Sequence, residues 1–272
     1  MKHNAGVLAI NGTQLYYEES GSGETVILLH AHSFDLRMWD SQIEALAQHY
    51  RVIRYDLRGY GKSAMPDPRR FFRHVDDLAQ LIQRLELSKV HLIGLSLGSM
   101  VAVDYMALYP EKVLSVSAAS SGLYVSEDAQ WIPFTEEVQS GNPAPKNDVN
   151  ITLFKQEWFQ GLLGSCGPNR DAIKTELWTM IKEWSAWQPL YERRWPLVGP
   201  SLIALLSRNS TGIPLLVLIG EEDSDGSRKS SARLAELMPQ AITVYLPQSG
   251  HMQNMETPEA FNKVVLSFIH SE

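Results

Sequence analysis

Short segments rich in apolar residues, separated by turn residues, recur along most of the chain and predict strands. The segment 25–30, TVILLH, is a continuous apolar run of the kind buried on both faces of a parallel sheet. Asn11-Gly12, between the first two segments, favours a tight hairpin because such a turn needs positive φ angles. The eight segments expected as strands are 6–10, 14–19, 25–30, 52–55, 90–93, 113–118, 215–219 and 242–246.

Amphipathic segments alternate with these strands and predict helices. Between 75 and 85 the apolar residues fall on one stripe at helical spacing, and similar patterns occur at 38–47, 98–106, 231–238 and 261–268. Strands that alternate with helices favour right-handed crossovers. The pattern therefore predicts an α/β fold, with a mostly parallel eight-stranded sheet and helices on both faces.

The alternation stops between residues 123 and 212. Apolar residues from Asp171 to Trp184 recur at steps of three and four, which predicts a helix of about four turns that ends before Pro189. We expect 123–212 to be an inserted helical cap, and 1–122 together with 213–272 to form the α/β core. Six of the seven tryptophans fall in this segment, either as its own core or as pocket lining: Trp131, Trp158, Trp178, Trp184, Trp187 and Trp195.

Composition narrows the function classes. A net charge of -7 without a basic run disfavours a nucleic-acid partner. The single cysteine, Cys166, cannot form an internal disulfide, which fits a reducing compartment. The N-terminal apolar run is too short for a signal peptide, and no window approaches the ~18 apolar residues of a membrane span. We expect a cytoplasmic protein that needs neither a cofactor nor a metal ion.

The stretch 90–100, VHLIGLSLGSM, is the strongest candidate for chemistry. An apolar strand runs into Gly94-Leu95-Ser96-Leu97-Gly98, and helical spacing follows. A serine on a sharp strand-to-helix turn stands clear of the backbone, and glycines two residues away on each side allow the strand and the helix to pack closely. Ser96 is therefore the predicted nucleophile.

A serine nucleophile needs a base whose pKa lies near working pH, and histidine is the usual choice. Of eight histidines, His251 is the best placed, because it follows a predicted strand in a Ser-Gly-His loop at the carboxyl edge of the sheet. The acid that orients it should follow an earlier strand, where four candidates lie: Glu221, Glu222, Asp223 and Asp225.

These motifs resemble the α/β-hydrolase superfamily over essentially the whole chain. The matching pieces are the loop 30–35, the segment 56–63 (DLRGYGKS), the GLSLG turn, IGEED at 219–223 and QSGHM at 248–252. The resemblance implies Asp223 as the acid, three residues after Gly220, with Asp225 as the second choice. It also implies an oxyanion hole made by the amides of Leu97 and His32.

One departure from the family pattern concerns this oxyanion hole. Ala31 stands where the family usually has glycine, and its methyl group would restrict the backbone beside the second donor. The side chain of His32 is also unusual at its position. It could enter the pocket or only pack over the loop.

The nucleophile and the size of the chain narrow the activity. A serine argues against haloalkane dehalogenases and epoxide hydrolases, which need a carboxylate nucleophile. The chain resembles carboxylesterases, enol-lactonases and cofactor-free haloperoxidases, which implies hydrolysis of a small hydrophobic ester or lactone through an acyl-enzyme. A ligand receptor with slow turnover, a C–C bond hydrolase and a perhydrolase are alternatives. Arg193 and Arg194 could bind a substrate carboxylate.

Overall fold

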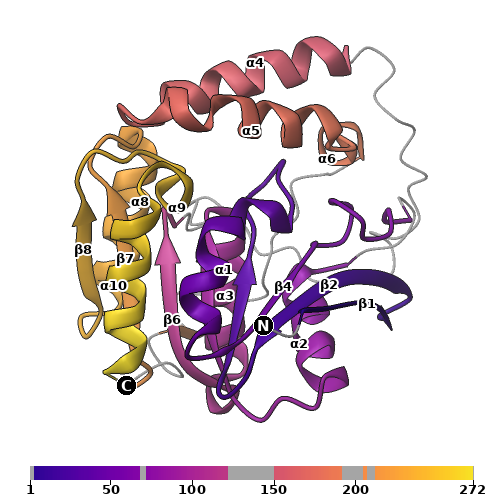
Figure 1. Ribbon diagram of the computed structural model, residues 1–272, viewed down its shortest axis with the longest axis vertical. Coiled ribbons are helices and arrows are strands. Elements are labelled where there is room, and N and C mark those ends of the chain that lie inside the picture. The colour runs from indigo at the N-terminus through magenta and orange to yellow at the C-terminus, as the bar shows by residue number, and fades with distance from the viewer. Residues whose placement is uncertain (1–2, 68–71, 122–149, 192–204, 207–211, 272) are drawn as a thin grey trace.

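An eight-stranded sheet forms the centre of the molecule (Figure 1). The computed structural model describes residues 3–67, 72–121, 150–191, 205–206 and 212–271. Strand order is β1-β2-β4-β3-β5-β6-β7-β8, antiparallel only at β1–β2 and β2–β4. All eight predicted strands are present, as β1 (His3–Ile10), β2 (Thr13–Gly21), β3 (Thr25–Leu29), β4 (Arg51–Tyr55), β5 (Val90–Leu95), β6 (Val113–Ala119), β7 (Leu215–Gly220) and β8 (Ile242–Leu246).

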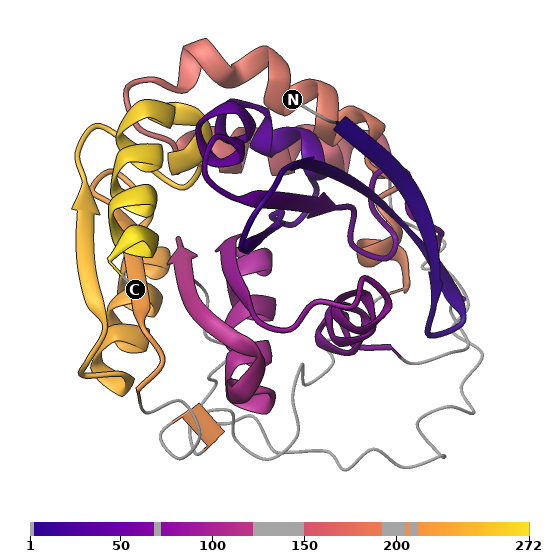
Figure 2. The ribbon, with the colours of Figure 1, turned by 60° about the horizontal axis from the view of Figure 1, so that its bottom comes forward.

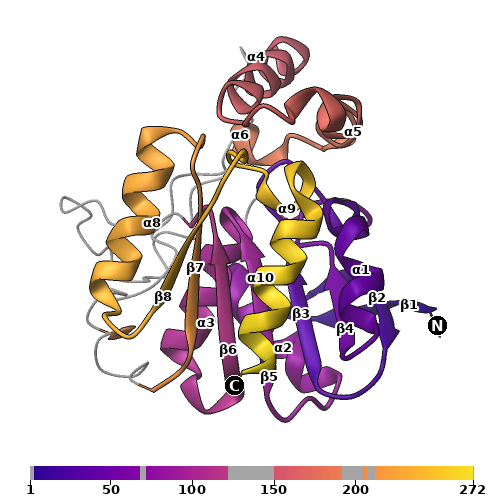
Figure 3. The same ribbon diagram turned by 60° about the vertical axis from the view of Figure 1, so that its left-hand side comes forward.

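Helices cover both faces of this sheet, as the alternation predicts. The helices α1 (Asp40–Ala47) and α10 (Pro258–His270) pack together on one face, whereas α2 (His74–Arg84), α3 (Leu97–Leu108) and α8 (Asp225–Leu237) lie on the other (Figure 3). Each face has its own buried apolar cluster. Shorter helices connect these elements: η1 (Leu36–Trp39), η2 (Pro110–Lys112) and α9 (Gln253–Glu256).

The predicted hairpin forms one edge of the sheet, opposite β8 (Figure 2). Asn11 and Gly12 have φ angles of 43° and 69°, as the tight turn requires. The Asn11 side chain also donates to Asp77 of α2, 3.0 Å away, which fastens the turn to the core.

Three helices from the predicted cap are described: α4 (Ile151–Gly164), α5 (Arg170–Glu183) and α6 (Trp187–Tyr191). Both α4 and α5 lie beyond one end of the sheet (Figures 1 and 3). This is the carboxyl end, because Ser165 binds the loop after β8 and Trp158 binds the loop after β3. The start of the predicted cap, at residue 123, lies outside the described residues.

One helix boundary agrees with the expectation and another differs. The helix α5 has 14 residues and ends at Glu183, before Pro189 as predicted, and the ammonium of Lys155 binds the carbonyls of Lys182 and Trp184 there. The helix α8 begins at Asp225 rather than at Ser231. Its first turns carry polar side chains and so give no apolar stripe. No described helix is long and apolar enough to cross a membrane.

Candidate active site

Ser96 occupies the sharp turn between β5 and α3 that the sequence predicts. Its φ of 53° and ψ of −114° are unfavourable for a residue with a side chain, at a cost of roughly 1–3 kcal/mol. Close packing enforces the turn. A Cβ added to Gly94 would lie 2.3 Å from the carbonyl oxygen of Gly98, and one added to Gly98 would lie 2.0 Å from that of Leu29. Only glycine fits at either position, so strand and helix meet closely around the half-buried serine.

Backbone contacts hold Ser96 against the next strand. Its amide donates to the carbonyl of Ala119 at the end of β6, 2.9 Å away. The adjacent Ser120 has a φ of 44°, and its hydroxyl donates to the carbonyl of His251 at 3.0 Å. Ser120 therefore links the serine turn to the loop that carries His251.

The loop that carries His251 follows β8 and is fixed on both sides. The His251 amide donates to the carbonyl of Ser165 at 2.8 Å. The carboxylate of Glu256 accepts hydrogen bonds from the amides of Gly250 and Met252, at 3.1 and 3.0 Å. Burial raises the pKa of Glu256, and these amides partly offset that effect. The imidazole therefore extends from a rigid backbone.

Asp223 follows β7 and contacts the His251 ring. Its two carboxylate oxygens lie 3.1 and 3.0 Å from Nδ1 of His251. Asp223 also accepts hydrogen bonds from the hydroxyl of Ser227 and from the amide of Ser224. Burial alone would raise its pKa, but the bonds to His251, Ser227 and Ser224 hold that pKa below the usual range. The carboxylate therefore stays charged beside the ring.

Asp225, the second choice for the acid, has different surroundings. Its side chain is 78% exposed and pairs with Arg228 on the first turn of α8. The structure thus brings Asp223 and His251 together and leaves Asp225 at the surface. Among the described residues the hydroxyl of Ser96 has no hydrogen-bond partner, although Ser120 joins its turn to the His251 loop.

His30 fixes the loop that follows β3. The amide of Leu57 donates to Nε2 of His30 at 2.9 Å, so the ring proton must sit on Nδ1, which faces the carbonyl of Ala31 at 2.8 Å. Burial lowers the pKa of His30 to about 4, so the ring is neutral at pH 7. Two backbone groups therefore define both the tautomer and the orientation of this ring.

The backbone of this loop accommodates Ala31 without a left-handed conformation. The described residue in the loop with positive φ is Ser33, at 68°, and not Ala31. The restriction expected from the methyl group therefore does not arise. The amides of His32 and Leu97 donate to no other described residue, so both can donate to a bound substrate.

The His32 side chain lies between the core and the predicted cap. Its Nδ1 is 2.7 Å from the hydroxyl of Tyr60, and its ring meets Trp158 and Trp184 edge to face, with centroids 5.3 and 4.9 Å away. Burial lowers the pKa of His32 to about 4, which makes the ring neutral at pH 7. The side chain therefore joins an aromatic cluster that links the loop to α4 and α5.

The tryptophans of the predicted cap differ in their surroundings. Trp184 and Trp187 are buried, and Trp178 packs on Phe159. Trp158 is 37% exposed, and its indole nitrogen donates to the Ser33 hydroxyl at 2.8 Å. The other two tryptophans and the two arginines considered for carboxylate binding lie outside the described residues: Trp131, Trp195, Arg193 and Arg194.

Sequence reasoning did not identify Ser120, Ser227 or Glu256. Ser227 stands four residues after Asp223, but its place in the first turn of α8 was not predicted, because that helix was expected to begin at Ser231. Ser120 and Glu256 act through backbone groups and leave no pattern in the sequence. Cys166 is buried, and burial together with Glu256 raises the pKa of its thiol, which disfavours a reactive thiolate.

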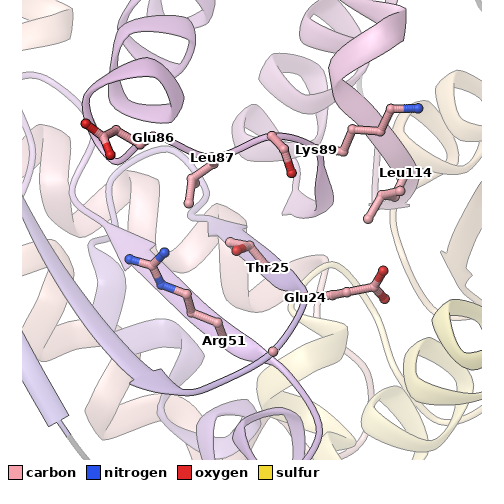
Figure 4. Close-up of a pocket in the computed structure, with 9 residues that line it drawn as sticks. Glu24, Thr25, Arg51, Glu86, Leu87, Lys89 and Leu114 are labelled. Atoms are coloured by element: carbon pink, nitrogen blue, oxygen red, sulfur yellow. The ribbon is translucent and has the colours of Figure 1, made fainter.

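A hollow of about 510 Å³ opens at the opposite end of the sheet (Figure 4). Its lining comes from residues at or near the start of β3, β4, β5 and β6, including Thr25, Arg51 and Leu114. Ser96, Asp223 and His251 do not line it. Within the described ranges, no group of three or more His, Cys, Asp or Glu side chains is arranged to hold a metal ion.

Comparisons with known proteins agree with this architecture. A family model described as the alpha/beta hydrolase fold matches residues 24–258. An (E)-2-((N-methylformamido)methylene)succinate hydrolase from Acinetobacter baylyi is 24% identical over 263 residues, which cover 96% of each chain. A pimeloyl-[acyl-carrier protein] methyl ester esterase from Aeromonas salmonicida is 27% identical over 258 residues, covering 93% of this chain and 98% of that protein.

A solved structure shows the same fold. An esterase from Exiguobacterium antarcticum matches with a TM-score of 0.77 at 20% identity, covering 97% of this chain and 98% of that one. Because the family match spans most of the chain, this protein belongs to the α/β-hydrolase fold family.

Proposed function

We propose that this protein is a serine hydrolase that cleaves a carboxylic ester or lactone of a small hydrophobic substrate through an acyl-enzyme. The observation that carries the proposal is the Asp223 carboxylate on Nδ1 of His251, at the same sheet edge as the strained turn of Ser96. This arrangement suits acyl transfer, since it supplies a nucleophile, a base and an acid that orients the base.

In the proposed mechanism His251 removes the proton of Ser96 as the hydroxyl oxygen attacks the substrate carbonyl. Asp223 fixes the ring tautomer through Nδ1 and stabilises the imidazolium that forms. The amides of Leu97 and His32 stabilise the oxyanion, and His251 returns its proton to the leaving alkoxide. Water then attacks the acyl-enzyme with His251 again as base, which releases the acid and restores Ser96.

We also propose that residues 123–212 form a cap that supplies an apolar pocket wall. Trp158 on α4 and Trp184, which directly follows α5, face His32, whose amide is the proposed oxyanion donor. Aromatic surface at that position favours a neutral, hydrophobic acyl group over a sugar or a polyanion. The A. salmonicida relative is named as a methyl ester esterase, which agrees with an ester substrate.

A panel of p-nitrophenyl esters and lactones tests the proposal directly. We expect multiple turnovers by the wild type, and a loss on the order of 10⁶ in kcat for Ser96→Ala if the three residues act as a unit. His251→Ala should lose nearly as much. A Ser96→Ala variant with more than about a tenth of wild-type turnover would contradict the nucleophile assignment, since tenfold corresponds to only ~1.4 kcal/mol. Binding without repeated turnover would favour the receptor alternative.

A further inference from the structure

Ser33 has a conformation that its own chemistry does not favour. It has a φ of 68° and is fully buried, one residue after His32. A left-handed backbone is costly for a residue with a Cβ, and glycine is the usual solution. Within the loop, the amide of Phe34 donates to the carbonyl of Ala31 at 3.3 Å, which closes a turn around His32 and Ser33. A contact from outside the loop adds to this local support.

Trp158 on α4 provides such a contact. Its indole nitrogen donates to the Ser33 hydroxyl at 2.8 Å, across 125 positions of sequence. Because 37% of Trp158 remains exposed, burial of its ring does not by itself explain its position. Phe154, one turn earlier on α4, stacks on the same ring with centroids 6.4 Å apart.

Neighbouring residues also contact α5 and the residue that follows it, but not through Ser33. Arg37 of η1 pairs with Glu183, and both side chains are substantially exposed, so solvent weakens the interaction. The rings of His32 and Trp184 meet edge to face, which orients the imidazole and not the peptide after it. Among the described residues, the hydrogen bond from Trp158 is the one that reaches the Ser33 side chain.

We propose that Trp158 is a positioning residue that holds the oxyanion loop in its working conformation through Ser33. The inference rests on the proposed function, in which the amide of His32 stabilises the oxyanion. Through this bond, the position of helix α4 on the core affects the geometry of the oxyanion hole. The cap then contributes to the chemical step in addition to the pocket wall.

The first test is Trp158→Phe, which keeps an aromatic ring and removes the indole donor. Because an oxyanion donor acts in the transition state, kcat for a p-nitrophenyl ester should fall about tenfold or more while KM changes little. Trp178→Phe is the matched control. It also removes an indole from the cap helices, but its ring packs on Phe159 away from Ser33.

A double-mutant cycle separates the hydrogen bond from general packing. Ser33→Gly accepts the left-handed backbone without help and also removes the hydroxyl. In the Ser33→Gly background, Trp158→Phe should therefore lower kcat only slightly, whatever the kcat of Ser33→Gly alone. An equal loss in both backgrounds would overturn the proposal, because Trp158 would then act by packing. Should Trp158→Phe fail to fold, Ser33→Gly should be more active than Ser33→Ala, and equal activities would overturn the proposal.

Amide hydrogen exchange without substrate tests whether Trp158 holds the loop backbone, and it does so independently of any activity. The amides of residues 32–34 should exchange faster in Trp158→Phe than in Trp178→Phe. This measurement stands even where the wild type hydrolyses no ester, so failure of the proposed function and failure of this inference remain distinguishable. Unchanged exchange at these amides in Trp158→Phe would contradict the inference.

Discussion

Two aspartates that are two residues apart, Asp223 and Asp225, differ in what they contact. Asp223 is buried beside His251, whereas Asp225 pairs with Arg228 at the surface. Asp223→Asn should therefore lower kcat by orders of magnitude, since the amide cannot stabilise the imidazolium or fix its tautomer. Asp225→Asn should stay near wild type in the same ester assay. If Asp225→Asn were inactive and Asp223→Asn fully active, Asp225 rather than Asp223 would be the acid that orients His251.

The residues that contact one another through side chains were more predictable than those that act through the backbone. The position after β7 left four acids open, and the resemblance to the α/β-hydrolase superfamily selected Asp223 among them, whereas His251 followed from its place after β8. Ser120 and Glu256 hold the His251 loop through a carbonyl and two amides, and backbone groups carry no residue-specific signal. The left-handed conformation at Ser33 was also unpredictable, because the family pattern directed attention to Ala31.

At the scale of elements, the packing of α3 against β3 depends on Gly98. A Cβ there would lie 2.0 Å from the Leu29 carbonyl oxygen, where both partners are backbone. Gly98→Ala should destabilise the protein by at least about 3 kcal/mol or prevent folding.

Gly161→Ala is the matched control for Gly98→Ala. Gly161 lies within α4, and an added Cβ would meet nothing within 4 Å. Alanine should therefore stabilise that helix by about 0.5–1 kcal/mol. Urea unfolding measures both variants. Similar unfolding midpoints for the two would show that the close approach at Gly98 does not constrain the fold.

The proposed cap leads to a prediction about substrate length. Trp158 and Trp184 supply aromatic surface beside the proposed oxyanion donor. For p-nitrophenyl esters of increasing acyl length, each buried methylene should raise kcat/KM about fourfold, or ~0.8 kcal/mol, until the pocket is full. A flat series, or a clear preference for an acyl chain that bears a carboxylate, would contradict the apolar pocket and favour an enol-lactonase activity.

Periodicity explains which elements were predictable. Strands buried on both faces and helices with one apolar stripe were found within a few residues, because burial dictates their pattern. The start of α8 was missed because its first turns face solvent with polar side chains. The packing of α4 on the loop after β3 was also missed, because single contacts such as Trp158 to Ser33 leave no periodic trace.

For the whole molecule, buried histidines predict sensitivity to acid. Burial lowers the pKa values of His30 and His32 to about 4 and that of His74 to about 3, from 6.5. The unfolded chain then binds more protons between pH 6.5 and 4, so the stability present above pH 6.5 is lost as pH falls. Each histidine contributes up to about 1.4 kcal/mol per pH unit.

The variant His74→Phe isolates one of these histidines. Buried acids act in the opposite direction: burial raises the pKa of Asp56 to about 7, so the folded state retains that proton. The wild type loses unfolding free energy between pH 7 and pH 5, and His74→Phe should lose up to about 2 kcal/mol less. The effect is limited to this size because the histidine of the unfolded chain takes up its proton only below about pH 6.5. Urea titrations at both pH values measure it. An unchanged difference would show that His74 is not held neutral by the fold.

The central claim is that Ser96 carries the acyl group. The most direct measurement is reaction of the wild type with a fluorophosphonate, followed by intact mass determination and peptide mapping. We expect one adduct per chain, on Ser96, with loss of ester turnover in proportion to labelling. The assignment of Ser96 would be contradicted by ester turnover that persists in fully labelled protein. It would also be contradicted by an adduct on a different residue that by itself abolishes turnover.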